Sequence, residues 1–409
     1  MSKTIRRSHD LRSENRRRVV ESLRRIGPCS RVDLGEATEL SPGAISSFAS
    51  DLLNEGVATA TRKSVGRGRP QSVLALCPSA ATMITVSLSI DRLDLLLIDY
   101  AGDVLDQHQR DLDTRALDEH GFIDTVLSAV DTLAQSPNAT NLLQISIGVQ
   151  GITSHPEGEL VWSPILSITN VPLQNAVRQR FGISTTVDND SRLIASALQA
   201  SECGTLGSNF ATVIFSHGIG LALILDEKPF SGISTSALEF GHMRHELNGE
   251  LCRCGQRGCI EAYASDYAIV RYLERHDSEF GQARSDDKNM PAGRLAPGVL
   301  SLAAERAAKG DKQAKAAFAA AGNAIGCGLR DLSLLFGRMP VALVGRNASA
   351  LDAMRPQLLA ALETAGPQSM DPGKVVLSEF SDVDDLLLQG LILNALTEAD
   401  RQLAHTITS

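Results

Sequence analysis

The chain has 409 residues, 43% of them hydrophobic, which is long enough for two or three domains with a large core. No apolar stretch follows the basic start and no run of about eighteen apolar residues occurs, so we expect a soluble protein that is neither exported nor membrane-bound. The formal net charge of −9 is uneven: residues 1–80 hold 14 Lys+Arg against 8 Asp+Glu (+6), and residues 81–409 hold 25 against 40 (−15). A basic head on an acidic body predicts that the head binds a polyanion.

The head begins with two predicted helices. Apolar residues recur at helical spacing over residues 15–26, with arginines on the opposite face, and Gly27-Pro28 ends the pattern. Ser30 is a capping residue type, and it precedes a second predicted helix over residues 31–38. This second helix is expected to turn three apolar side chains inward, namely Val32, Leu34 and Ala37.

A third helix is predicted over residues 44–54. Ser41 supplies its N-cap and Pro42 its first helical position. Its buried face is expected to consist of Ile45, Phe48, Leu52 and Leu53. The opposite face has only small side chains, as a helix that enters the major groove of DNA needs. These small residues are Ala44, Ser46, Ser47 and Ser50, and the first three, with Ser41, are the predicted DNA contacts.

Residues 56–76 read as a β-hairpin with a basic tip. Residues 56–60 and 72–76 favour strands, and Gly66-Arg67-Gly68-Arg69-Pro70 between them favours a flexible turn. A hairpin beside three helices predicts a winged helix-turn-helix over residues 1–80. Arg67 and Arg69 would then contact phosphates or a narrow A·T-rich minor groove. A small helical adaptor or a dimerisation arm is the alternative that this segment leaves open.

Residues 81–409 read as a mixed α/β body. Strands are predicted over residues 82–90 and 93–99, then a helix over residues 121–134 and a buried strand over residues 142–149. This order, strands first and then helix-strand alternation in a second half, resembles the actin-like, ribonuclease-H-like architecture of sugar kinases. The resemblance implies two lobes with a ligand cleft between them.

Four metal-ligand side chains occur within eighteen residues, and they are His242, Cys252, Cys254 and Cys259. A Cys₃His set meets the tetrahedral N/S preference of Zn²⁺, and four protein ligands leave no position for an activated water, so we expect a structural zinc ion. His245 competes with His242 on spacing, and free thiols in a loop are the alternative. The remaining cysteines form no disulfide pattern, which favours a reducing, cytoplasmic setting. They are Cys29, Cys77, Cys203 and Cys327.

The same loop supports a family resemblance. Glu239-Phe240-Gly241-His242, followed by Cys252-Arg253-Cys254 and Cys259-Ile260-Glu261, resembles the signature of the ROK family (repressors, open reading frames, kinases). Asn189-Asp190 matches the family's E-N-D-A-N segment, whose Asn binds a sugar hydroxyl and whose Asp is the base in phosphorylation. The residues at 188, 191 and 192 depart from that segment: they are Asp188, Ser191 and Arg192. The resemblance implies a sugar site that consists of Asn189, Asp190, Glu239, His242 and Glu261.

The nucleotide-binding motifs of kinases in this family are incomplete in this chain, because glycines are missing from them. Residues 86–92 contain no glycine where the enzymes have a D-x-G-x-T loop. Residues 216–222 place Leu221 and Ala222 at positions where the enzymes have glycine. A third element is reduced to Val344-Gly345-Arg346. Because phosphoryl transfer depends on positioning and charge neutralisation, we expect no kinase activity.

Residues 300–336 form an Ala-rich helical stretch. Gly310 and a group of glycines at 322, 326 and 328 are expected to interrupt it, and small residues there would allow close helix packing. We expect this stretch to form core and a dimer surface.

These observations predict a sugar-responsive DNA-binding transcriptional regulator, a repressor of carbohydrate uptake or catabolism genes. Its partners would be double-stranded operator DNA, a monosaccharide or derivative in the cleft, and further copies of the chain in a homodimer or homotetramer. Two alternatives stay open. One is a bifunctional ATP-dependent sugar kinase with a DNA-binding head, and the other is a regulator that no longer senses sugar and responds to a protein partner.

Overall fold

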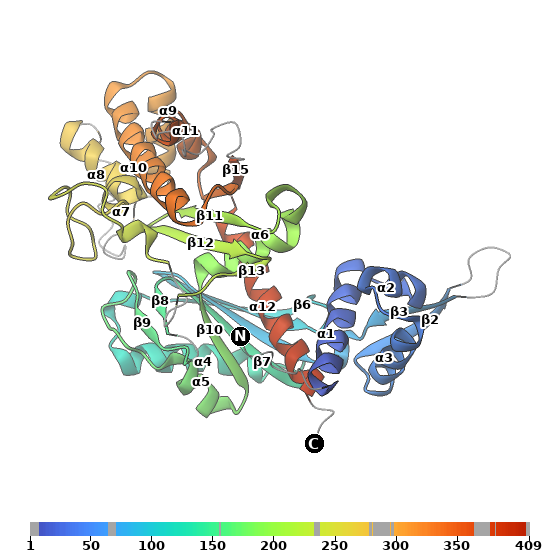
Figure 1. The fold of residues 1–409 in the computed structure, drawn as a ribbon. Helices are drawn as coiled ribbons and strands as arrows, with labels where there is room; N and C mark the ends of the chain where they lie inside the picture. Colours follow the sequence, from blue (N-terminus) through green and yellow to red (C-terminus); the bar gives the residue numbers. More distant parts are fainter. Residues whose placement is uncertain are drawn as a thin grey trace.

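The structure is a computed structural model, and it describes residues 8–63, 71–154, 157–232, 238–277, 280, 295, 298–363, 377–380 and 382–405. Figure 1 shows a small N-terminal head beside one lobe of the body, a second lobe above the first, and a long C-terminal helix that runs from the body to the head. Within the described residues, no helix is both long and apolar enough to cross a bilayer.

The head has the predicted helices and hairpin. Its helices are α1 (Ser8–Ile26), α2 (Arg31–Thr38) and α3 (Pro42–Asn54). Its antiparallel sheet has the order β1-β3-β2, with strands β1 (Cys29–Ser30), β2 (Ala58–Lys63) and β3 (Gln71–Leu76). Ser30 and Ser41 cap α2 and α3, because each hydroxyl accepts a hydrogen bond from a backbone N–H three residues later at 3.3 Å. The arrangement is a winged helix-turn-helix, as predicted. The hairpin tip, with Arg67 and Arg69, lies outside the described residues.

Two details of the head differ from the sequence prediction. α1 begins at Ser8 rather than at residue 15, so the helix is longer than its apolar stripe. Val32 was expected inside, but 67% of it is exposed. α2 has only about two turns, and it buries one stripe, Leu34 and Thr38, at a spacing of four. Val32 is two residues from Leu34, which places it on the opposite face of the helix.

The first lobe is built on a five-stranded sheet of order β10-β7-β4-β5-β6. The strands are β4 (Thr82–Leu88), β5 (Arg92–Asp99), β6 (Val104–Asp111), β7 (Leu142–Val149) and β10 (Ser184–Asn189). β4, β7 and β10 are parallel, and β5 and β6 extend the sheet antiparallel. Its helices are α4 (Glu119–Ala134) and α5 (Leu173–Phe181), and a small hairpin follows β7, formed by β8 (Ile152–Thr153) and β9 (Leu160–Trp162). The predicted strands and helix of this half are confirmed.

The second lobe has a sheet of order β13-β12-β11-β14-β15. The strands are β11 (Phe210–Phe215), β12 (Ile219–Leu225), β13 (Lys228–Pro229), β14 (Val341–Gly345) and β15 (Leu377–Phe380). The helices are α6 (Asp190–Leu206), α7 (Glu261–Ala264), α8 (Asp266–His276), α9 (Val299–Ala308), α10 (Lys312–Phe336) and α11 (Ala348–Glu363). The two mixed α/β lobes confirm the predicted fold class.

The glycines of α10 do not interrupt the helix, contrary to the sequence prediction. Gly310 separates α9 from α10, but α10 continues through residues 322–328. A Cβ at Gly322 would lie 2.3 Å from the carbonyl oxygen of Met354, and one at Gly326 would lie 2.6 Å from that of Leu358. These glycines therefore allow the backbone of α11 to pack directly against α10, as the prediction of close helix packing required.

The C-terminal helix α12 (Val383–His405) joins the parts. It packs against α6, the strands β4 and β7, and helix α1 of the head. A Cβ at Gly390 would lie 2.1 Å from the carbonyl oxygen of Leu193, so α12 crosses α6 in backbone contact. At the other end, Ala395, Leu396 and Ala399 belong to one hydrophobic cluster with residues of α1, α2 and α3. Head and body therefore share a continuous core.

Candidate functional site

The base of the candidate site lies where β10 ends and α6 begins. The Asn189 side chain is buried, its Nδ2 donates to the carbonyl oxygen of Gly151 at 2.7 Å, and its Oδ1 accepts from the Ser191 N–H at 2.9 Å. Asp190 Oδ1 accepts from the same N–H at 2.7 Å. Gly151 has a φ of +128°, and a Cβ there would lie 2.2 Å from the carbonyl oxygen of Trp162, so this close approach needs glycine.

The opposite wall comes from the second lobe. Glu239 precedes the 3₁₀ turn Phe240–His242, and its carboxylate lies 3.6 Å from Nε2 of His242. Glu261, the first residue of α7, is only 6% exposed. Its Oε1 accepts from the Tyr267 hydroxyl at 3.3 Å, which holds the carboxylate in place.

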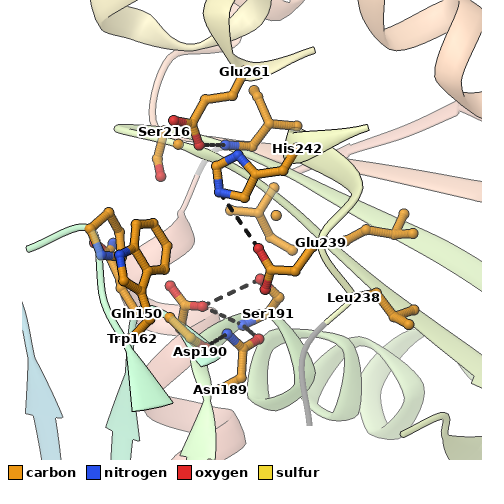
Figure 2. A pocket seen from close by; sticks show the side chains of 17 residues that line it. Gln150, Trp162, Asn189, Asp190, Ser191, Ser216, Leu238, Glu239, His242 and Glu261 are labelled. Carbon is orange, nitrogen blue, oxygen red and sulfur yellow. Dashed lines mark hydrogen bonds and ion pairs between the residues drawn. The ribbon is translucent and has the colours of Figure 1, made fainter. Parts of the chain in front are cut away.

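The structure brings together all five predicted sugar-site residues. Figure 2 shows Asn189 and Asp190 at the base of one pocket, with Glu239, His242 and Glu261 around it. The cavity has a volume of about 80 Å³. Sequence reasoning missed four further polar or aromatic lining residues, which are Gln150, Trp162, Ser191 and Ser216. Trp162, on β9, faces His242 edge-on at a ring distance of 5.7 Å, so the two lobes touch across the site.

Removal of the Asp190 carboxyl from water raises its pKa to about 6, although hydrogen bonds from Ser191 oppose the shift. Arg346 lowers the pKa of this carboxyl and Glu239 raises it. The carboxyl can therefore change between a hydrogen-bond donor and a charged acceptor near neutral pH.

The predicted metal ligands also converge. One ligand atom from each of His242, Cys252, Cys254 and Cys259 lies within 4.8 Å of the others. His245 instead packs edge-on against the Tyr263 ring at 5.2 Å, and it is not part of the cluster. Gly258, at a φ of +79°, allows the loop to close, because a Cβ there would lie 1.7 Å from the carbonyl oxygen of Glu246. Three thiols and an imidazole at this separation fit a tetrahedral metal ion such as Zn²⁺.

Two thiols of the cluster resist ionisation without a positive partner. Burial raises the pKa of Cys252 and of Cys259. A divalent cation would compensate the thiolate charges and bind with release of protons.

A cavity of about 520 Å³ lies beside the β4–β5 turn, the segment at which the family resemblance implies a phosphate loop in the kinases. It contains two arginines, each already paired with a carboxylate: Arg92 with Asp94 at 2.7 Å, and Arg346 with Asp384 at 2.8 Å. The side chains of Leu221 and Ala222 do not face this cavity, because both are buried in β12. Leu221 lines the sugar-site pocket instead. The expectation that these side chains and the glycine-free β4–β5 turn prevent phosphate binding stays a prediction.

The predicted DNA face lies on one side of α3. Ile45, Phe48 and Leu52 are buried, and Leu53 is half-buried. Ser41, Ser46, Ser47 and Ser50 are exposed and Ala44 is half-buried. The serines therefore give the second helix of the helix-turn-helix an exposed polar face.

Comparisons with known proteins agree with this architecture. The family model described as "ROK family" matches residues 83–380. The chain is 28% identical over 253 residues to the xylose repressor of Caldicellulosiruptor bescii, an alignment that spans 60% of this chain and 62% of the repressor. The crystal structure of a ROK family transcriptional regulator, a homologue of the E. coli MLC protein, matches 96% of this chain and 100% of its own, with 21% identity and a TM-score of 0.73. A Streptomyces griseus ROK family glucokinase, in complex with glucose and AMPPNP, matches 77% of this chain and 99% of its own, with 23% identity and a TM-score of 0.61.

Proposed function

The chain belongs to the ROK family, and on this premise we propose that it is a transcriptional repressor whose hold on operator DNA is controlled by a sugar bound in the cleft. The observation that carries the proposal is the buried connection, through α12, between a winged helix-turn-helix and a cleft with five hydrogen-bonding site residues. The likeness to a xylose repressor supports a role in sugar-dependent gene control.

The sugar site would bind through hydroxyl groups. Asp190, Glu239 and Glu261 offer acceptor oxygens, and the Asn189 amide both donates and accepts. His242 would use Nδ1, which lies 3.7 Å from Cys252 Sγ, for the metal, and its Nε2 would remain for Glu239 or the ligand. The zinc ion would be structural and would fix the His242 ring at the edge of the cleft.

The head would bind operator DNA as one of a pair. A homodimer or homotetramer would present two α3 helices to successive major grooves of a pseudo-palindromic site. Ser41, Ala44, Ser46 and Ser47 would contact base edges or phosphates, and Arg67 and Arg69 would act from the wing tip. A sugar releases the operator only if it binds one arrangement of the lobes better than the other.

We expect Ser47→Glu to weaken operator binding by about 1–3 kcal/mol, which is about five- to 150-fold, because a carboxylate on α3 faces the phosphates. Fluorescence anisotropy on labelled DNA measures this loss. Ser201→Glu is the matched control, because Ser201 is also an exposed helical serine but lies on α6 in the body. Equal losses in both variants would argue against α3 as the DNA-contacting helix.

We expect sugar affinity to fall at acid pH. A sugar hydroxyl donates to the ionised form of Asp190, so binding favours proton release from a group whose pKa is about 6. Affinity is then nearly constant above about pH 7, falls about twofold between pH 7 and pH 6, and drops about fivefold between pH 6 and pH 5. Calorimetric titration at several pH values measures it. Asp190→Asn is expected to bind more weakly and without this pH dependence, and a pH profile that persists in the variant would assign it to another group.

Sugar kinase activity is the second candidate, since the fold is shared with a glucokinase and Asp190 is retained. We propose that this chain does not transfer phosphate, because the β4–β5 turn lacks glycine and both arginines of the adjacent cavity are paired with carboxylates. Sugar-dependent consumption of ATP above that of an Asp190→Asn control would refute this.

The first test of the function is fluorescence anisotropy of the protein on DNA from upstream of its own gene, titrated with monosaccharides, sugar phosphates and polyols. Release by one class of compound supports a sugar-controlled repressor. Tight binding that none of them alters would indicate a regulator that responds to a protein partner, and the absence of DNA binding would overturn the proposal.

A further inference from the structure

Acidic side chains dominate the charge of the cleft lining. Three carboxylates line the cavity, from Asp190, Glu239 and Glu261, and no lysine or arginine is among the described lining residues. Residues 233–237, which precede the lining residue Leu238 in the chain, read Ile-Ser-Thr-Ser-Ala and contain no ionisable side chain. An anionic group on a ligand would therefore meet net negative charge in a partly desolvated site.

Three arginines on segments next to the cleft are engaged in other contacts. Arg192 pairs with Asp188 at 2.9 Å and donates to the carbonyl oxygen of Phe230 at 2.8 Å. Arg253 stacks on the Tyr267 ring at 3.8 Å, and Arg346 pairs with Asp384. None of these guanidinium groups lines the cavity.

The helix N-terminus at the base of the cleft is also occupied. The first amide of a helix is a common phosphate site. In α6, however, Asp190 is the first residue, and its own carboxylate accepts from the Ser191 N–H at 2.7 Å. A phosphate that approached this end would meet a carboxylate.

Trp162 supplies an aromatic surface in a cavity that also has aliphatic lining residues, among them Ile219 and Leu238. It is the single tryptophan of the chain, and in Figure 2 its ring stands across the pocket from Glu239 and His242. Aromatic rings in polar pockets bind the apolar faces of ligands and fix their orientation. The C–H face of a sugar ring fits against the indole, while its hydroxyl groups point to the carboxylates.

We propose, on the basis of the proposed function, that the cleft takes an uncharged monosaccharide held between Trp162 and the three carboxylates, and that it excludes sugar phosphates. Hydroxyl groups donate to carboxylates, which match them, whereas a phosphate offers acceptors and negative charge. Ligand cavities usually measure about 300–1,000 Å³, and this one has about 80 Å³. The sugar therefore enters as the lobes separate, and the Trp162–His242 contact breaks.

The fluorescence of Trp162 tests the proposal directly, because no other tryptophan contributes. The full chain is titrated with matched pairs: glucose and glucose 6-phosphate, N-acetylglucosamine and its 6-phosphate, xylose and xylose 1-phosphate. We expect at least one uncharged sugar to change the emission, and its phosphate to bind at least a hundredfold more weakly. A phosphate that binds as tightly as its parent sugar, or the failure of every uncharged sugar to bind, overturns the proposal.

A charge variant makes the test independent of which sugar binds best. Leu238→Lys places a cation at the half-buried edge of the cavity, and Leu238→Met is the uncharged control of similar length. The lysine is expected to improve phosphate binding at least tenfold and the methionine to leave it unchanged. Equal behaviour of the two variants would show that charge does not set the selectivity.

A second variant pair tests the stacking contact by calorimetry, which does not need the tryptophan signal. Trp162→Phe keeps an aromatic face and is expected to lose less than about threefold in affinity for the uncharged sugar, whereas Trp162→Ala loses at least tenfold. Equal affinities in both would overturn the role of Trp162. Anisotropy on operator DNA without sugar is measured in parallel, so failure of the repressor function is distinguished from failure of this selectivity.

Discussion

Replacement of Cys259 by serine is expected to remove the bound zinc ion and to abolish the sugar response while operator binding survives. Cys259 is buried, and its Sγ lies 3.8 Å from that of Cys254. The hydrophobic cluster of this loop consists of only three buried residues, Cys252, Cys259 and Ala262, so the metal would replace the core that the loop lacks. Structural zinc contributes about 10–16 kcal/mol in isolated zinc-finger peptides, and loss of one ligand forfeits a large part of such a contribution.

Metal analysis, thermal unfolding and anisotropy on operator DNA measure this result. About one zinc ion per chain is expected in the unaltered protein and much less in Cys259→Ser. Operator binding should persist, because the head cluster contains no residue of the loop. Cys327→Ser is the matched control, since Cys327 is a half-buried free thiol on α10 that lies outside the metal cluster. A zinc-free Cys259→Ser protein with a full sugar response would refute the coupling.

The metal cluster was predictable because its ligands lie close together in the sequence. The types and the spacing of four residues were enough to predict the cluster: His242, Cys252, Cys254 and Cys259. The choice between His242 and His245 did not follow from local chemistry. It depends on how Tyr263 of α7 packs against the loop, which is a tertiary contact.

Trp162 was not predictable as a site residue. It lies on a three-residue strand, and it joins the site only because Gly151 brings the β8–β9 hairpin against Asn189 and because the second lobe places His242 opposite. A single tryptophan in a chain with few aromatic residues was the available signal, but sequence alone gives a large apolar ring no preference for a cleft over a core.

The connection between head and body was also invisible in the sequence. The helical pattern of the head predicted its own fold, but the partner of Arg24 is Asp400, 376 residues later. Nothing local indicates that an arginine on the basic face of α1 turns toward a C-terminal helix. The charge asymmetry that identified the head as a DNA-binding module treated its arginines alike. In the structure several arginines of α1 have partners within the protein: Arg16 pairs with Glu55, Arg18 donates to the carbonyl oxygen of Thr38, and Arg24 pairs with Asp400.

The junction between head and body is built on a buried charge. Asp400 Oδ1 accepts from Arg24 at 2.8 Å and from the Tyr100 hydroxyl at 2.5 Å. Arg24 also donates to the carbonyl oxygen of Tyr100 at 2.6 Å, and its guanidinium lies 4.8 Å from the centre of that ring. The side chains of Asp400 and Arg24 are 3% and 15% exposed. Since α12 contacts α6 beneath the sugar site at Gly390, a shift of the lobes reaches the head through this helix.

We therefore expect Asp400→Ala to uncouple the head from the cleft. Removal of one partner of a buried pair leaves the other charge unpaired and costs about 3–5 kcal/mol, which denaturant unfolding measures. Sugar should still bind, but it should no longer release operator DNA in an anisotropy titration. Glu398→Ala is the control on the same helix: it breaks the exposed Glu398–Arg401 pair and should cost about 0–1 kcal/mol with the response intact.

The double variant Arg24→Met, Asp400→Leu should recover stability, because apolar residues replace a buried pair well. Its sugar response then decides between two roles for the junction: a restored response would mean that packing alone transmits the signal, and a lost response would assign transmission to the Arg24–Asp400–Tyr100 contacts.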